Sequence, residues 1–151
     1  MSTKFIKQFL GNHLHELIGF SYALGEDMNQ CEGIVTDSLL AYSFEQEMNY
    51  FDETKNKDVL KGVSRIIFAR HLSQKGFSIE EKSSKQPIEG KFFLLSDFEK
   101  AVCFLKYRMS LNVADISQVV DMNSYEVISA LANSKFFLTG NGLNNLSEEL
   151  L

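Results

Sequence analysis

The sequence is short of features that would interrupt helices or place the chain in a membrane. Its 151 residues include one proline, and no apolar run approaches the roughly 18 residues of a membrane span. The segment Met1–Phe20 has no long apolar stretch and no small-residue cleavage site, so we read no secretory signal. With one proline and 13 phenylalanines available for packing between helices, the composition predicts an all-α protein. The cytoplasm is the compartment expected from its few cysteines.

Cysteine is also scarce. Cys31 and Cys103 lie far apart in the sequence, each within an apolar helical pattern. Free cysteine is among the residue types most often buried, and disulfides are rare in a reducing compartment. We interpret the two cysteines as reduced core thiols. A redox-sensing pair is the alternative.

The chain lacks the local motifs of common enzymes and metal sites. It has no glycine-rich phosphate loop and no GxSxG, HExxH or DxD pattern. His13 and His15 would point to different faces of a helix, and no cysteine or carboxylate cluster completes a site with either of them or with His71. We therefore expect no catalytic site, metal, cofactor or small-molecule substrate, and a binding protein rather than an enzyme.

Positive charge is limited to the middle of the chain. The net charge is −5. Residues 1–51 carry two lysines against seven acids, and residues 91–151 carry five basic residues against seven acids. Only residues 52–90 are net positive, with eight basic residues against six acids. A general nucleic-acid binder is usually basic throughout, so any DNA contact is expected in the middle segment.

The pattern predicts two small helical domains. Residues 1–76 form the first, residues 77–95 a linker, residues 96–138 a trihelical helix-turn-helix domain, and residues 139–151 a tail. Phe77–Gly90 is the strongest linker segment because it holds the proline, paired serines and charges without apolar periodicity.

Three amphipathic helices are expected in the first domain: Thr3–Leu24, Asn29 to about Asn49, and Val59–Lys75. Gly25 and Gly76 follow the first and last of these, as glycine often does at a helix end. The inward residues expected in the first helix are Ile6, Leu10, Leu14, Leu17 and Ile18. Those expected in the second are Cys31, Ile34, Val35, Leu39 and Tyr42. Those expected in the third are Leu60, Val63, Ile67 and Leu72.

Capping signals define the second domain. Ser96 and Glu99 form a capping box before a stripe of Phe98, Ala101, Val102, Leu105 and Met109. Asn112 can cap a short helix, and Asp121-Met122-Asn123 is a tight turn. A further helix from about Ser124 carries a stripe of Val127, Leu131, Ser134 and Leu138. Two helices this short need the third to bury their apolar faces, which predicts a helix-turn-helix unit of the kind that enters a DNA groove.

These residues resemble the extracytoplasmic-function sigma factors of bacteria. The segment Leu111–Leu138 is similar to that family's fourth conserved region, and the matching positions are Leu111, Asp115, Ile116, Ser117, Val120, Met122, Val127, Ser129 and Leu131. In the amino-terminal half, Cys31–Leu40 is similar to the family helix that grips RNA polymerase, and Val59–Gly76 to the basic helix at the −10 promoter element. The match covers both halves in the family's order.

Some positions depart from the family pattern. Glu32 and Asp37 match the polymerase-binding helix, but Gly33 and Thr36 replace an Asp and a Gln. The turn has Asp121 where the family usually has glycine. The last helix carries Lys135 as its only cation, whereas family members usually carry several.

The resemblance implies residues for DNA contact. On the basic helix they are Lys61, Arg65, Arg70 and Lys75. On the last helix they are Ser124, Tyr125, Ser129 and Asn133. A solvated helix face is the alternative for the basic set. Tyr50 and Phe51 could stack on a flipped base, although such a pair more often belongs to the core.

Two functional hypotheses follow. The first is a sigma-factor-like transcription regulator that binds core RNA polymerase and promoter DNA. The second is a sigma mimic with little DNA binding that acts on a protein such as an anti-sigma factor. In either case the residues expected to bind polymerase or a partner are Glu32, Asp37, Tyr125 and Ile128.

Overall fold

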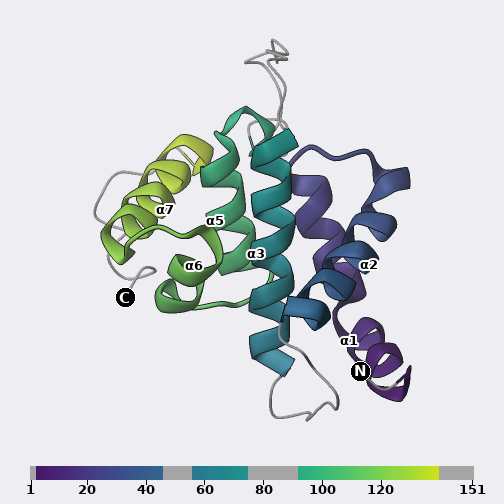
Figure 1. Ribbon diagram of the computed structural model, residues 1–151. Helices are drawn as coiled ribbons and strands as arrows, with labels where there is room; N and C mark the ends of the chain where they lie inside the picture. Colours follow the sequence, from purple (N-terminus) through teal and green to yellow (C-terminus); the bar gives the residue numbers. More distant parts are fainter. Residues whose placement is uncertain (1–2, 46–55, 75–91, 140–151) are drawn as a thin grey trace. The chain divides into compact units, whose positions relative to one another are not determined.

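The computed structural model describes residues 3–45, 56–74 and 92–139, and these residues are helical with no strand. The fold is therefore all-α, as predicted. The helices are α1 (Thr3–Ala23), α2 (Met28–Glu45), α3 (Asn56–Gln74), α5 (Asp97–Tyr107), α6 (Val113–Val120) and α7 (Ser124–Thr139) (Figure 1). None of them has the length and apolar character needed to cross a membrane.

The chain separates into two compact units, Met1–Gln74 and Lys75–Leu151. The first contains α1, α2 and α3, and the second contains α5, α6 and α7. Most of the predicted linker and the tail after Thr139 lie outside the described residues, so their structure stays a prediction.

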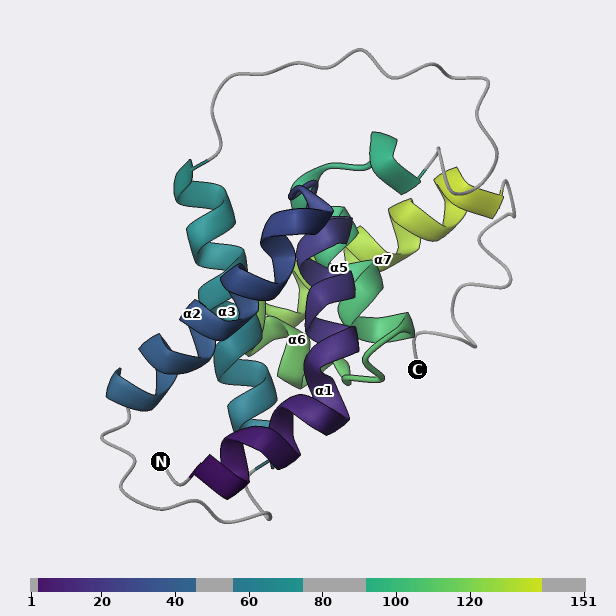
Figure 2. The same cartoon turned by 90° about the vertical axis from the view of Figure 1, so that its right-hand side faces the viewer.

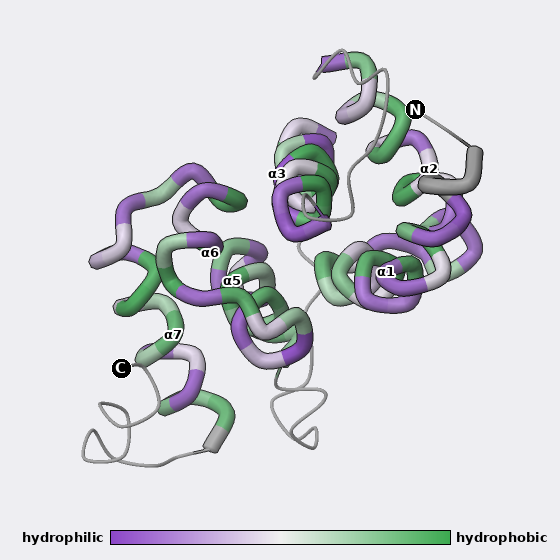
Figure 3. Tube along the Cα trace, turned by 90° about the horizontal axis from the view of Figure 1, so that it is seen from below, coloured by the Kyte–Doolittle hydropathy of each residue, from purple (hydrophilic) through white to green (hydrophobic). Residues whose placement is uncertain are grey.

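In the first unit each helix packs against the other two (Figure 2). Apolar and hydrophilic residues are distributed to different sides of these helices, which lets each bury one side (Figure 3). In α2, Cys31, Val35, Leu39 and Tyr42 are buried as predicted, and Ile34 is half-buried. The turn before α2 is tied to the end of α3 because His71 Nδ1 lies 2.9 Å from Glu26 Oε1.

The predicted inward face of α1 was wrong in its centre. Leu17 is buried, but Leu10, Leu14 and Ile18 are only half-buried, and the Ile6 side chain lies outside the described set. The fully buried large side chains of α1 are instead Phe9, Leu17 and Phe20, followed by Leu24. Their spacing follows a neighbouring stripe of the same helix, where two phenylalanine rings bury more area than leucines do.

The inward face of α3 was predicted in part. Leu60, Val63 and Ile67 are buried, but Leu72 is 47% exposed, so its predicted core position was wrong. Leu72 lies in the last turn of α3, where the apolar stripe has run past the packed surface. Ile66 and Phe68 are buried in addition to the predicted set.

The second unit begins with the predicted capping box. Ser96 Oγ accepts from the Glu99 N–H at 3.1 Å, and Glu99 Oε1 accepts from the Ser96 N–H at 3.2 Å. Most of the predicted core residues are buried, while Phe98 and Leu138 are half-buried. The buried set is Ala101, Val102, Leu105, Met109, Ile116, Val119, Val120, Val127, Leu131 and Ser134. The three helices contact one another pairwise, which confirms the predicted trihelical arrangement of this segment.

Gly62 makes the contact between α2 and α3 possible. A Cβ at this position would overlap the ring of Tyr42, which is itself 9% exposed. Burial, assisted by the nearby Asp58 carboxylate, raises the pKa of Tyr42. Gly33, in the middle of α2, is exposed, and a Cβ added there would have no neighbouring heavy atom within 4 Å. The two glycines therefore have different roles.

We predict that Gly62→Ala lowers the free energy of unfolding by about 1–3 kcal/mol, because the new methyl group displaces the Tyr42 ring. Gly33→Ala is the matched control and should raise it by about 0.5–1 kcal/mol, since alanine loses less backbone entropy in a helix. Urea unfolding followed by circular dichroism measures both. Equal effects of the two substitutions would show that α2 and α3 do not approach each other at Gly62.

Candidate functional site: the outer face of α7 and its groove

The turn before α7 fixes the direction of that helix. Asp121 has left-handed backbone angles, φ 56° and ψ 48°, which an aspartate tolerates better than most residues. Asn123 Oδ1 accepts from the Glu126 N–H at 2.8 Å and caps the first turn of α7. Ser117 Oγ donates to the Met122 carbonyl across the turn. Asp121 thus adopts a left-handed turn conformation that glycine takes up more readily.

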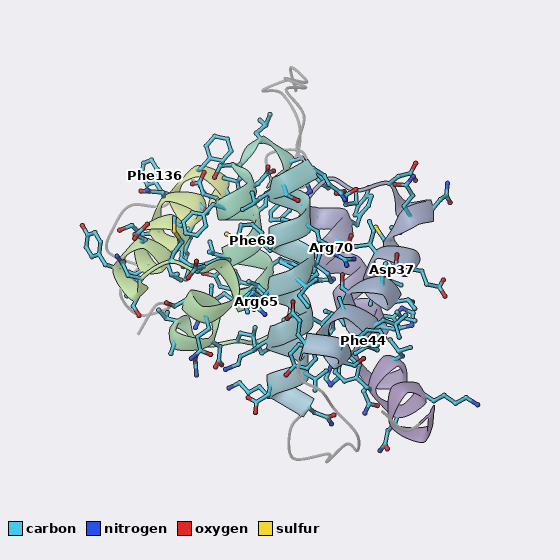
Figure 4. The ribbon with its side chains drawn as sticks, viewed as in Figure 1. Asp37, Phe44, Arg65, Phe68, Arg70 and Phe136 are labelled. Atoms are coloured by element: carbon cyan, nitrogen blue, oxygen red, sulfur yellow. The ribbon has the colours of Figure 1, made fainter. Side chains whose placement is uncertain are left out.

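α7 exposes a face rich in aromatic side chains. Tyr125 is 78% exposed, Ile128 38% and Phe136 52%. Tyr125 and Phe136 are separated by about three helical turns and so lie on one side of α7. Phe136 projects outward near the end of the helix (Figure 4). Ser124 and Asn133 are also exposed, and Ser129 is half-buried.

An open groove of about 430 Å³ lies between the start of α5 and the first half of α7. It brings together residues of α5 and α7 that lie far apart in the sequence. From the α5 side it is lined by Ser96, Phe98 and Glu99, and from α7 by Tyr125, Glu126, Ser129, Ala130 and Asn133. Three of the residues expected to contact DNA, Tyr125, Ser129 and Asn133, are therefore in this groove, whereas Ser124 is not among its lining residues.

The groove is acidic. Its lining includes two carboxylates, Glu99 and Glu126, and no basic side chain. Glu99 is held in place because Ser96 Oγ donates to its Oε1 at 2.9 Å and Ser134 Oγ lies 3.5 Å from its Oε2. Such a surface repels a phosphodiester backbone, whose contacts supply most non-specific DNA affinity.

Two lysines of the second unit, Lys100 and Lys135, do not offset this negative charge. Lys100 is 5% exposed, and its Nζ lies 3.3 Å from Asp97 Oδ1 within α5. A buried, ion-paired ammonium is unavailable to a phosphate. Lys135 lies about two and a half helical turns after Glu126, which places it on the opposite side of α7.

The basic residues of α3 do not share one face. Lys61 and Arg65 are one turn apart and continue a stripe that begins at Lys57. Arg70 follows Lys61 by about two and a half turns, so it lies on the opposite side of the helix. Figure 4 labels Arg65 and Arg70 on α3. Lys75 lies outside the described residues, as do Tyr50 and Phe51.

One residue of the Lys57–Lys61–Arg65 stripe, Arg65, is paired with a carboxylate. Arg65 Nη2 lies 3.2 Å from Glu45 Oε2 at the end of α2, with both side chains about half exposed. An exposed pair of this kind contributes little stability, roughly 0–1 kcal/mol, so a competing anion could displace Glu45. The carboxylate nevertheless reduces the positive charge that α3 presents.

The residues expected to bind a partner on α2 are separated in a similar way. Glu32 and Asp37 are both exposed, but five residues of helix turn them well away from each other. Asp37 instead shares a stripe with Leu40 and Phe44, which are 46% and 80% exposed. Asp37 and Phe44 can be followed along α2 in Figure 4.

The two cysteines are free and buried, consistent with core thiols. Burial raises the pKa of the Cys31 thiol and also that of Cys103. A raised pKa leaves little thiolate at neutral pH, so neither is activated for nucleophilic or redox chemistry. Among the described side chains no group of three His, Cys, Asp or Glu residues could hold a metal ion.

The groove itself cannot be recognised from the sequence. Ser96-x-x-Glu99 predicted the cap that fixes Glu99, and helical spacing predicted an outward Tyr125, but no local pattern shows that α5 and α7 bring them together. Comparisons of the chain with protein families, curated proteins and solved structures found no match.

We predict that any non-specific DNA binding at low salt runs through the Lys57–Lys61–Arg65 stripe. The double variant Lys61→Ala/Arg65→Ala should weaken it for all sequences and reduce the salt slope by about one per lost phosphate contact. Arg70→Ala is the control and should change little, because Arg70 lies on the other side of α3. Fluorescence anisotropy across a salt series measures DNA binding by both variants. If Arg70→Ala weakens binding as much as the double variant does, DNA does not bind specifically at the Lys57–Lys61–Arg65 stripe.

Proposed function

We propose that this protein is a transcription regulator with a sigma-factor-like organisation that acts mainly by binding proteins. Its partner would be core RNA polymerase or an anti-sigma-type regulator, and it would work as a binding protein rather than an enzyme. The observation that carries this proposal is the outer face of α7, where exposed aromatic side chains lie beside an open groove whose lining includes two carboxylates and no basic residue.

The energetics of recognition favour a protein over DNA at this face. DNA affinity depends on cations placed against phosphates. Protein interfaces depend on a few aromatic anchors that become buried on binding, and tyrosine is among the residues most enriched in that role. Tyr125 and Phe136 offer such anchors. The carboxylate of Glu126, next to Tyr125 in the first turn of α7, would repel a DNA phosphate.

The α2 stripe supplies a second protein-binding surface. Leu40 and Phe44 are exposed one turn apart, with the Asp37 carboxylate beside them. In the sigma resemblance this segment corresponds to the helix that grips RNA polymerase. An exposed apolar pair next to an acid suits a partner helix that carries both apolar and basic residues.

Promoter binding by the same chain is the second candidate. The observation that favours it is the Lys57–Lys61–Arg65 stripe of α3, which repeats at one-turn intervals. In the sigma resemblance α3 is the helix at the −10 element. With the acidic groove on α7, such a protein would contact DNA through α3 alone.

We predict that the tagged protein, recovered from its native cells, captures RNA polymerase subunits or one small regulator through the α2 stripe. Leu40→Ala/Phe44→Ala should reduce that capture at least tenfold, because the variant removes the exposed apolar pair. Met28→Ala is the matched control: Met28 is 54% exposed but lies on another side of α2.

Quantitative mass spectrometry of nuclease-treated eluates identifies what is captured. Nuclease treatment separates protein contacts from co-purification on DNA. Recovery of neither polymerase nor a stoichiometric protein partner, or equal loss with Met28→Ala, would contradict the proposed function.

A further inference from the structure

We infer that the groove between α5 and α7 binds an arginine side chain presented by an amphipathic segment of a protein partner. The inference deepens the protein-binding function proposed above by giving the chemistry of what this face recognises. It rests on three features of the groove: its shape, its fixed negative charge and its exposed aromatic ring.

The shape suits a side chain that enters from a partner. The groove's volume of about 430 Å³ is within the range of ligand sites, but it is open to solvent along one side. An open groove cannot enclose a free small molecule. It can receive a side chain whose backbone stays outside, while Phe136 and Ile128 remain exposed nearby on α7 for apolar contacts with the same segment.

The negative charge is in part preorganised. Glu99 cannot swing away, because its carboxylate accepts hydrogen bonds from the Ser96 N–H and hydroxyl, and the Ser134 hydroxyl lies beside it. Glu126 lines the α7 side of the groove from the first turn of that helix. A cation entering here would be attracted by Glu99 and could pair directly with Glu126.

The aromatic and polar lining distinguishes arginine from lysine. The face of the Tyr125 ring, with Phe98 on the α5 side, can stack against a planar guanidinium. Ser129 and Asn133 add a hydroxyl and an amide carbonyl that can accept its remaining N–H groups. A guanidinium offers a planar fork of donors to a carboxylate, whereas the ammonium of lysine is a compact point charge.

The test uses the full chain and synthetic peptides. The probe is a fluorescein-labelled twelve-residue helical peptide of leucine and alanine with one central arginine. Its matched partner carries citrulline, which has the same shape without the charge, and a third peptide carries lysine. We expect the arginine peptide to bind at least tenfold more tightly than the citrulline peptide, with lysine between them, by fluorescence anisotropy.

Glu126→Gln should remove the preference for arginine over citrulline while leaving the fold intact, as circular dichroism would show. Asp27→Asn, at an exposed carboxylate before α2 whose hydrogen bond from the Asn29 N–H an asparagine can also accept, is the control and should leave the preference unchanged. Tyr125→Ala should weaken binding of the arginine peptide, and Tyr125→Phe should keep most of that binding because the aromatic ring remains.

Three results would overturn the inference: equal binding of the arginine and citrulline peptides, a preference that survives Glu126→Gln, or no binding of any peptide up to millimolar concentration. The outcome is separable from the proposed function. If the arginine preference is found but no transcription protein is captured from cells, the groove binds arginine and the proposed function is wrong. If a transcription protein is captured but the preference is not found, only the inference about arginine is wrong.

Discussion

The turn between α6 and α7 is the constraint on which the exposed face of α7 depends. Asp121 takes the left-handed conformation, Asn123 caps the next helix, and Ser117 reaches across to the Met122 carbonyl. Together they direct Val127 and Leu131 into the core of the second unit, and this leaves Tyr125 outside. The surface chemistry of α7 is therefore a consequence of how its capped turn sets the helix rotation.

The capping box at the start of α5 provides the other half of the site. Glu99 satisfies backbone and hydroxyl donors of Ser96, and this structural role also holds a carboxylate at the edge of the groove. A typical cap stabilises a helix end by about 1 kcal/mol. The same hydrogen bonds hold the Glu99 carboxylate at the groove, so the groove presents a negative charge there. Glu99 therefore has a structural role at the helix end and, in the proposed site, a second role in recognition.

Charge placement is the basis for proposing a protein rather than DNA as the partner of this chain. Sequence proximity gathers basic residues on α3, but helical geometry turns Arg70 away from Lys61, and Glu45 lies against Arg65. In the second unit Lys100 is buried against Asp97. These four basic residues are thus separated on different helix faces or paired with an acid, while Phe44 and Tyr125 remain exposed on two different helices.

Local signals predicted the second unit well because caps and turns are encoded by adjacent residues. Ser96 and Asn112 cap the helices that they were predicted to cap, and Asn123, predicted only as part of a tight turn, caps α7. The rotation of α1 was not predictable in the same way, since Phe9 and Phe20 are buried through contacts with other helices. The groove likewise depends on residues of α5 and α7 that are far apart in sequence, and the pairing of Glu99 with Glu126 appears only in three dimensions.

The central claim is that the outer face of α7 meets a protein, and a photocrosslink tests it most directly. A photoreactive phenylalanine analogue is placed at Phe136 in the full chain, irradiated in the native cells, and compared with the same analogue at Tyr22 on α1, which is 43% exposed. We predict an adduct at position 136 that is digested by protease, survives nuclease and is absent at position 22. An adduct at position 136 that nuclease removes would show that α7 faces nucleic acid and would contradict the claim.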